Sequence, residues 1–307
     1  MLTERKKSGG NIMKVREVIQ TIIRATEVQP FPEGKTCDVL ITGDPEKEVR
    51  CIGSTFMATV DVIRRAVAEQ VDLIITHEPT WFTGADNLDW VDGDTVYLAK
   101  KKLVDESGIA IWRFHDYMHF AREDGIYRGF DRQTGWRFYR MPPLPADQAV
   151  MPGIRFDGCY EIPETTLRGL ASFLQETFSM PDIRYIGDPD MTVRRVGVLP
   201  GGGSLGLGVE QMPMQLMARR NLDVLLCGDL TEWTLPAYVR DASQMGMNRA
   251  IIVLGHERQE GGKRGHEHHE RQGRYEPQRP GQSGFTGYLY PDPGRDGGLS
   301  CYHQKRQ

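Results

Sequence analysis

An internal repeat constrains the fold of this chain more than any other sequence feature. Residues 43–50 read GDPEKEVR, and residues 187–194 read GDPDMTVR. After each copy come a short apolar run, a turn of small residues and a segment with helical periodicity. A pattern that returns in this way indicates that one folding unit was duplicated.

The two halves continue in the same order beyond the repeat. Helical patterns at 60–69 and 210–219 each lead into an apolar strand that begins after an aspartate, Asp72 or Asp223. A further helix and another apolar strand follow, at 109–114 and at 250–254. The order strand, helix, strand, helix, strand predicts two similar α/β domains with mostly parallel sheets. Continuous apolar strands are typical of sheets covered on both faces.

Composition predicts where these domains begin and end. The last 47 residues contain ten glycines but no Val, Ile, Met, Ala or Trp, so they offer little apolar surface to bury. We expect a flexible leader at 1–13, a first α/β domain at 14–130, a connector at 131–160, a second α/β domain at 161–262 and a disordered tail rich in Gly, Arg and His at 263–307.

Charge and cysteine content exclude several classes of protein. The formal net charge is −4 and the isoelectric point is about 6.1, which argues against binding to nucleic acid or to an anionic membrane surface. No apolar stretch is long enough to span a bilayer, and the first residues lack the apolar core of a signal peptide. The five cysteines form no CxxC pair. We expect a cytoplasmic protein with reduced thiols.

The placement of histidines is the strongest functional signal. His77, His115 and His256 each follow an apolar strand run directly or after one glycine. In an open parallel sheet, ligand sites form at the carboxyl ends of the strands. His119 lies four residues after His115, and Glu260 lies four residues after His256.

These side chains offer the mixture of donors that transition metals bind. The candidate ligands are His77, Glu78, His119, His256 and Glu260, with His115 and Asp116 next to them. Nitrogen and oxygen donors together suit Zn, Mn, Fe, Co or Ni, and a bridging carboxylate can hold two ions about 3.5–4 Å apart. The alternative is that single histidines at strand ends are ordinary hydrogen-bonded residues. A further group in the tail, 266–269, is more typical of a polar tract than of a metal site.

A glycine-rich turn gives a competing interpretation. Residues 201–206 follow a strand and match the GxGxxG pattern, and Asp229 lies further along as a possible ribose ligand. This pattern is common, so a tight turn that lets the backbone approach the site or the other half is the better interpretation. A dinucleotide-binding enzyme is therefore the less favoured of the functions considered.

Five segments together resemble the Nif-three-like family. They are DLIITHEPTWF (72–82), RFHDYMH (113–119), GDPDMTVRRVGVLPGGGS (187–204), DVLLCGD (223–229) and GHERQE (255–260). Members of this family are dinuclear-metal-centre hexamers, also named GTP cyclohydrolase I type 2 homologues. The resemblance runs from about residue 15 to residue 260.

The resemblance implies two similar α/β domains with a pair of divalent metal ions between them, in a toroidal hexamer. Glu78 stands where the family has a second histidine ligand, and His119 stands where the family has an aspartate ligand. His256 and Glu260 match the family's closing ligands. His115 and Asp116 then become supporting or substrate-facing groups and the candidate catalytic residues, and Asp229 and Glu232 are further supporting candidates.

The resemblance also frames the function. It favours a metal-dependent hydrolase of a small polar molecule, such as a nucleotide or a pterin precursor, because two metal ions can activate water. The alternative is a non-catalytic metal-binding or regulatory protein that acts through partners. In the family the chain continues after the last ligands as a helix and a strand that complete the second domain. We therefore expect the second sheet of this chain to lack an outer strand.

Overall fold

The computed structural model describes residues 12–151, 156–256 and 300–303, which form two compact units. The first unit extends to residue 124 and includes the strand near the end of the chain, and the second unit begins at residue 125.

The elements of the first unit are β1 (Met13–Lys14), α1 (Val15–Ala25), β2 (Leu40–Thr42), β3 (Glu48–Val49), β4 (Cys51–Thr55), α2 (Val60–Ala68), β5 (Leu73–Thr76), α3 (Thr95–Ser107), β6 (Ala110–Arg113), α4 (Asp116–His119) and β12 (Ser300–His303). Those of the second unit are α5 (Gly125–Thr134), the 3-10 helix η1 (Trp136–Tyr139), β7 (Cys159–Thr166), α6 (Leu167–Thr177), β8 (Arg184–Ile186), β9 (Thr192–Leu199), the 3-10 helix η2 (Gly201–Leu205), α7 (Met212–Arg220), β10 (Val224–Cys227), α8 (Leu235–Gln244) and β11 (Ala250–Val253).

Besides the small sheet β1-β3, the described residues form two five-stranded sheets with matching strand order and directions, although β7 precedes the other strands of its sheet and β12 follows those of its own. The strand order is β12-β4-β5-β6-β2 in the first unit and β7-β9-β10-β11-β8 in the second. In each sheet the three middle strands are parallel, and both edge strands run antiparallel to their neighbours. The predicted fold, two similar α/β domains with mostly parallel sheets, is therefore confirmed.

The repeated GDP turn has one geometry in both units. Gly43 has a φ of +100° and packs against Ala110, and Gly187 has a φ of +140° and packs against Ala250. An added Cβ would lie about 2.6 Å from the alanine Cβ in both places. Glycine is needed at each position because the backbone is left-handed and the neighbouring strand is too close for a side chain.

The aspartate that precedes the second parallel strand also acts alike in both units. Asp72 accepts hydrogen bonds from the backbone N–H groups of residues 50–51 at 2.8 and 3.2 Å. Asp223 accepts them from the N–H groups of residues 194–195, both at 2.8 Å. Each carboxylate thereby ties the start of its own strand to the start of the neighbouring strand, which fixes the register of the parallel pair.

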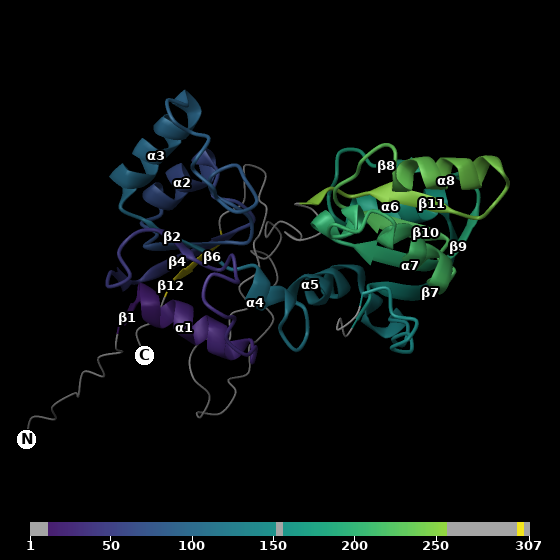
Figure 1. Ribbon diagram of the computed structural model, residues 1–307, viewed down its shortest axis with the longest axis horizontal. Coiled ribbons are helices and arrows are strands. Elements are labelled where there is room, and N and C mark those ends of the chain that lie inside the picture. Colours follow the sequence, from purple (N-terminus) through teal and green to yellow (C-terminus); the bar gives the residue numbers. More distant parts are fainter. Residues whose placement is uncertain (1–11, 152–155, 257–299, 304–307) are drawn as a thin grey trace, which may run out of the picture. The chain divides into compact units, whose positions relative to one another are not determined.

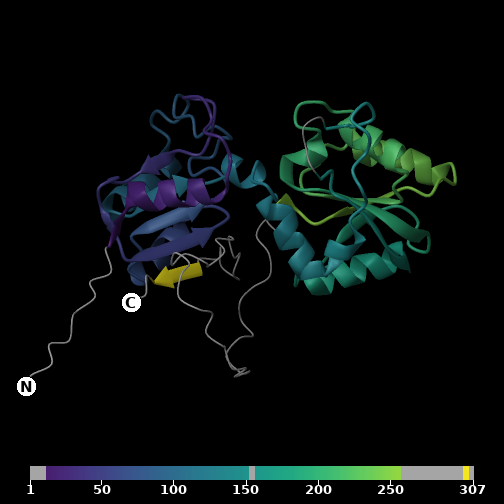
Figure 2. The same cartoon turned by 90° about the horizontal axis from the view of Figure 1, so that it is seen from below.

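Helices cover both faces of each sheet. In the second unit Val224 and Leu226 belong to the core that packs against α6, whereas Leu225 and Cys227 belong to the core that packs against α7 and α8. In the first unit α2 and α3 cover one face, and α1 lies on the other (Figure 1). The view in Figure 2 shows the strands of each sheet lying side by side between these helices. Alternating residues of one strand thus serve two cores, which explains the unbroken apolar runs.

The predicted connector belongs to the second unit. Residues 131–160 contain part of α5, all of η1 and the start of β7. Trp136 and Tyr160 are buried in the core with α6. The sequence of this segment shows no regular periodicity because its helices are short and its apolar residues are aromatic and widely spaced.

The expectation that the second sheet would lack an outer strand is wrong. Its edges are β7 and β8, and the strand from the tail, β12, joins the first sheet instead. There β12 pairs with β4, as β7 pairs with β9 in the second unit. The other residues of the predicted tail lie outside the described residues. Composition did not reveal β12, because an edge strand is held by backbone hydrogen bonds that a polar segment can also make.

None of the helices in the described ranges is both long enough and apolar enough to cross a membrane.

Candidate metal centre

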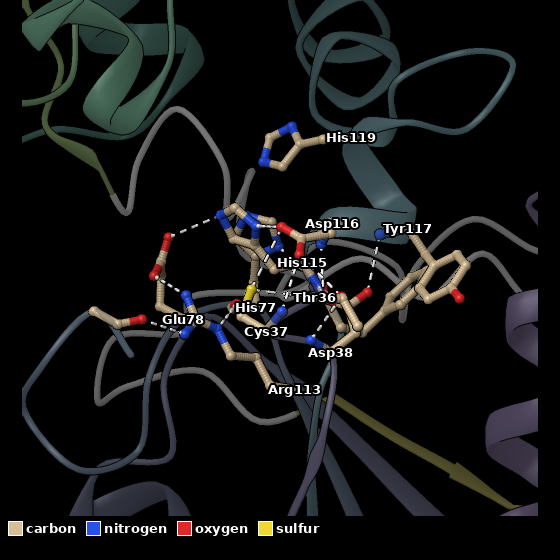
Figure 3. A network of polar contacts seen from close by, with 12 residues as sticks. Thr36, Cys37, Asp38, His77, Glu78, Arg113, His115, Asp116, Tyr117 and His119 are labelled. Carbon is tan, nitrogen blue, oxygen red and sulfur yellow. Dashed lines mark hydrogen bonds and ion pairs between the residues drawn. The ribbon is translucent and has the colours of Figure 1, made fainter. Parts of the chain in front are cut away.

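Three histidines of the first unit converge at the carboxyl ends of its strands. His77 follows β5, His115 follows β6, and His119 ends the short helix α4. Each can offer one ring nitrogen such that the three atoms all lie within 4.8 Å of one another. The ring centroids of His77 and His115 are 4.5 Å apart, and Figure 3 shows these rings with Glu78 beside them. This spacing matches nitrogens that could share one metal ion.

Each of the three rings places its Nδ1 atom against an oxygen acceptor. The pairs are His77 with the carbonyl of Phe114 (3.2 Å), His115 with the carboxylate of Asp116 (3.0 Å) and His119 with the carboxylate of Asp124 (2.9 Å). Carbonyl and carboxylate oxygens can only accept, so each Nδ1 carries the proton. The lone pair then lies on Nε2, which is the arrangement of metal-ligating histidines in general.

The environment keeps His115 neutral. Burial lowers the pKa of its imidazole to about 4, and repulsion from His77 and His119 adds to this, while the carboxylate of Glu78 opposes it. At neutral pH the ring therefore has no second proton to block Nε2. A neutral imidazole is the form that binds a metal ion.

Glu78 completes the cluster with a carboxylate. The residue is buried, and its Oε1 atom lies 3.7 Å from Nε2 of His115. Its Oε2 atom accepts a hydrogen bond from Arg113 at 3.2 Å. The first unit thus offers three converging imidazoles with one carboxylate beside His115, a combination that suits Zn, Mn, Fe or Co.

Sequence analysis missed Asp38, which holds the histidine loop in shape. Its carboxylate accepts hydrogen bonds from three successive backbone N–H groups, those of His115 (2.8 Å), Asp116 (2.7 Å) and Tyr117 (2.9 Å). Burial raises the pKa of Asp38, and these N–H groups act in the opposite direction. The carboxylate caps the start of α4, so it sets the path of the chain from His115 to His119.

Asp116 lies against the ring of His115 and the segment 36–37. Burial alone would raise its pKa, but hydrogen bonds from the Cys37 N–H, the His115 ring, the Thr36 hydroxyl and the Cys37 thiol outweigh this and bring it to about 2. The thiol of Cys37 lies 3.4 Å from Asp116, and burial raises the pKa of this thiol to about 12, so it is protonated. Cys37, His115 and Asp116 form a second group with metal-ligand spacing that shares His115 with the first.

The predicted role of His115 as a supporting group stays a prediction. Its ring has the same Nδ1 arrangement as His77 and His119. Its Nε2 also lies 3.7 Å from the Glu78 carboxylate. The geometry therefore gives His115 the features of a ligand.

The second unit carries a smaller set of the same kind. His256 lies beyond β11, and its Nδ1 atom is 3.0 Å from the carboxylate of Asp229. Gly201 packs on this ring, because an added Cβ would lie 2.2 Å from Nε2 of His256. Of the other predicted residues, Glu232 is exposed, and Glu260 lies outside the described residues, as do the tail histidines at 266–269.

This contact favours one interpretation of the glycine-rich turn. Residues Gly201–Leu205 form the 3-10 helix η2, and α7 begins only at Met212. A dinucleotide-binding turn opens directly into an α-helix, whose first N–H groups meet the pyrophosphate. Gly201 of this chain instead lets the backbone approach His256.

Comparisons with known proteins agree with this fold. The family model described as Duf34/NIF3 (NGG1p interacting factor 3) matches residues 13–263. The GTP cyclohydrolase 1 type 2 homolog of Clostridium acetobutylicum is 26% identical over 218 residues, which cover 71% of this chain and 74% of that protein. The protein of the same name from Clostridium perfringens is 23% identical over 249 residues, covering 80% and 86%. A Bacillus cereus protein related to NIF3 has a similar fold, with a TM-score of 0.60, 16% identity and coverage of 82% and 90%.

Proposed function

Because the chain belongs to the Duf34/NIF3 family, we propose that it binds divalent metal ions at the histidine cluster and hydrolyses a small polar molecule there. The observation that carries the proposal is the shared arrangement of the three imidazoles, each with Nδ1 against an oxygen and with one ring nitrogen within 4.8 Å of the other two rings. Such carboxylate or carbonyl partners fix the tautomer and raise the basicity of metal-ligating histidines.

The residues present fit a metal ion in geometry. His77, His115 and His119 each supply a ring nitrogen within 4.8 Å of the others, and Glu78 places a carboxylate oxygen beside His115. A bound divalent ion supplies a Lewis acid that lowers the pKa of a water molecule towards neutrality. The Asp116 carboxylate holds the proton of His115 on Nδ1, and Asp38 holds the backbone from which both side chains project.

A second ion is the finer part of the proposal. His256, oriented by Asp229, and Glu260 would supply its ligands together with a carboxylate shared with the first ion. We further propose a substrate that resembles a nucleotide or a pterin precursor, a homo-hexameric assembly and a cytoplasmic location. The names of the Clostridium relatives support the substrate class, since they refer to GTP cyclohydrolase.

Elemental analysis of the purified protein tests the metal binding directly. We expect wild type to retain one to two equivalents of a transition metal, His77→Ala to lose most of it, and His256→Ala to lose about half. Glu164→Gln, which removes an exposed carboxylate of the second unit, is the matched control and should leave the metal content unchanged. Metal-free wild type after growth in metal-supplemented medium would refute the proposal.

A substrate screen then separates the two classes of function. We expect hydrolysis of nucleotides or related heterocycles that stops on chelation and returns on addition of Mn²⁺ or Zn²⁺. Tight metal binding without turnover of any such compound would instead support a non-catalytic protein that acts through partners.

A further inference from the structure

The candidate metal centre contains a buried ion pair that its histidines do not require. Arg113 is the last residue of β6, and its guanidinium lies 3.2 Å from the Oε2 atom of Glu78. The side chains are 5% and 12% exposed. A carboxylate and a guanidinium buried together are stable only when each satisfies the other, because either one alone would be an unpaired charge in a poorly solvated site.

Arg113 also holds the backbone around this pair. Its Nε atom donates to the carbonyl of His77 at 3.3 Å, and its Nη1 atom donates to the carbonyl of Gly84 at 2.6 Å. One planar side chain thus connects a candidate nitrogen ligand, a candidate oxygen ligand and the loop that follows them. Lysine carries the same charge but lacks the planar, forked guanidinium group that reaches three acceptors at once.

The second unit shows what this position looks like without the arginine. By strand register Arg113 pairs with Thr76, and Val253 pairs with Cys227. Glu78 and Asp229 therefore occupy equivalent places, each two residues beyond the strand end. The side chain of Asp229 is 42% exposed and has Val253 at the equivalent strand position, whereas Glu78 is 12% exposed and has Arg113. The arginine accompanies the buried carboxylate and not the solvated one.

We propose that Arg113 is a positioning residue that makes Glu78 a one-oxygen ligand. By holding Oε2, the guanidinium leaves Oε1 as the oxygen offered to a cation beside His115, and it compensates the charge of the buried carboxylate. The pair then adds a hard oxygen donor to three imidazoles and shifts the site towards ions that favour oxygen ligands, such as Mn²⁺, over ions that favour imidazole, such as Ni²⁺. This inference rests on the proposed metal binding.

Calorimetric titration of the metal-free protein with Mn²⁺ and, separately, with Ni²⁺ tests the proposal. We expect Arg113→Lys to weaken Mn²⁺ binding by about 10–100-fold, the usual cost of losing an outer-shell partner, and to weaken Ni²⁺ binding much less. Glu78→Gln should have the same selective effect, and the double variant should be no worse than either single variant. Equal losses for both ions, or no loss, would overturn the proposal.

A matched control separates selectivity from general damage. Arg220 is another 5% exposed arginine, and it forms an ion pair with Asp157 in the second unit. Arg220→Lys should destabilise the protein to a similar degree yet leave the Mn²⁺ to Ni²⁺ preference unchanged. Loss of that preference in Arg220→Lys would show that the readout follows stability and would also overturn the proposal.

A further double variant, and the binding of both ions by wild type, keep the test decisive. Should Arg113→Lys fail to fold, Glu78→Gln with Arg113→Met removes both charges and leaves no buried ion. We expect this double variant to fold and to bind Mn²⁺ more weakly relative to Ni²⁺ than wild type does. If wild type binds neither ion, the proposed function fails, and this inference fails with it. If wild type binds both and the variants keep its preference, the inference alone fails.

Discussion

The two units share a framework and differ at the carboxyl ends of their strands. Strand order, strand direction, the GDP turn and the strand-tying aspartate are the same in both. The first unit places three histidines and a buried carboxylate at its strand ends, whereas the second places one histidine with a half-exposed aspartate. The shared residues, the turn glycine and the strand aspartate, hold the backbone in shape. The residues that differ lie where a ligand would bind.

This difference between the units explains why the repeat could be recognised in the sequence although the three-histidine cluster of the first unit is not repeated in the second. A left-handed glycine and a carboxylate that accepts two N–H groups are required by the backbone path itself, so any chain with this topology keeps them. The strand-end side chains are not part of these turn and strand contacts. They can therefore differ between the units while the turn and the strand pairing stay the same.

Alanine at the two turn glycines should give the largest effect on stability. We expect Gly43→Ala and Gly187→Ala each to lower the free energy of unfolding by about 3 kcal/mol or more, because the new Cβ overlaps the neighbouring strand and the backbone is left-handed. Urea denaturation measures both losses. Similar values would confirm that the two turns are structurally equivalent.

Two other glycines provide the control for that pair. Gly34 and Gly246 also have positive φ angles, but a Cβ on either would meet nothing within 4 Å. Alanine there should cost only about 1 kcal/mol of backbone strain. Equal losses at all four positions would mean that the close approach of strand and turn does not matter.

The strand-tying aspartates should give an intermediate effect. Asp72→Ala and Asp223→Ala each leave two backbone N–H groups without their acceptor, which we expect to cost about 1–3 kcal/mol in urea denaturation. In each unit a single carboxylate oxygen accepts both bonds, so Asp→Asn can keep that acceptor. The asparagine variants should therefore lose clearly less, and a loss as large as that of alanine would point to the charge rather than the hydrogen bonds.

A buried lysine should make the stability of the first unit depend on pH. Lys100 of α3 donates to the carbonyl of Thr80 at 2.6 Å, and burial lowers its pKa to about 8. Between pH 8 and about 10.4 the unfolded chain then binds more protons than the folded one, so the free energy of unfolding rises with pH by up to about 1.4 kcal/mol per unit.

Lys100→Met isolates this contribution. Subtracting its stability from that of wild type at each pH should leave a difference that is flat below pH 8 and rises above it. A difference that is constant up to pH 10 would mean that Lys100 stays protonated in the folded protein.

The fold could be predicted because its determinants are local in the sequence. Apolar strand runs, helical periodicity and the GDP turn each lie within a few residues, and their repetition gave the two-domain arrangement. The edge strand β12 could not be predicted, since its partner β4 lies more than two hundred residues away and its own composition is that of a polar tail.

The site could be predicted only in part, for the same reason. The strand-end positions of His77, His115 and His256 follow from the chain, because parallel strands bring their carboxyl ends to one edge. The groups that orient these histidines could not be predicted from the sequence. Asp38 caps the loop of His115 from 77 residues away, and Arg113 reaches Glu78 across 35 residues. A carboxylate or guanidinium has no local signature for such a role, since only the folded chain decides which N–H group or charge it meets.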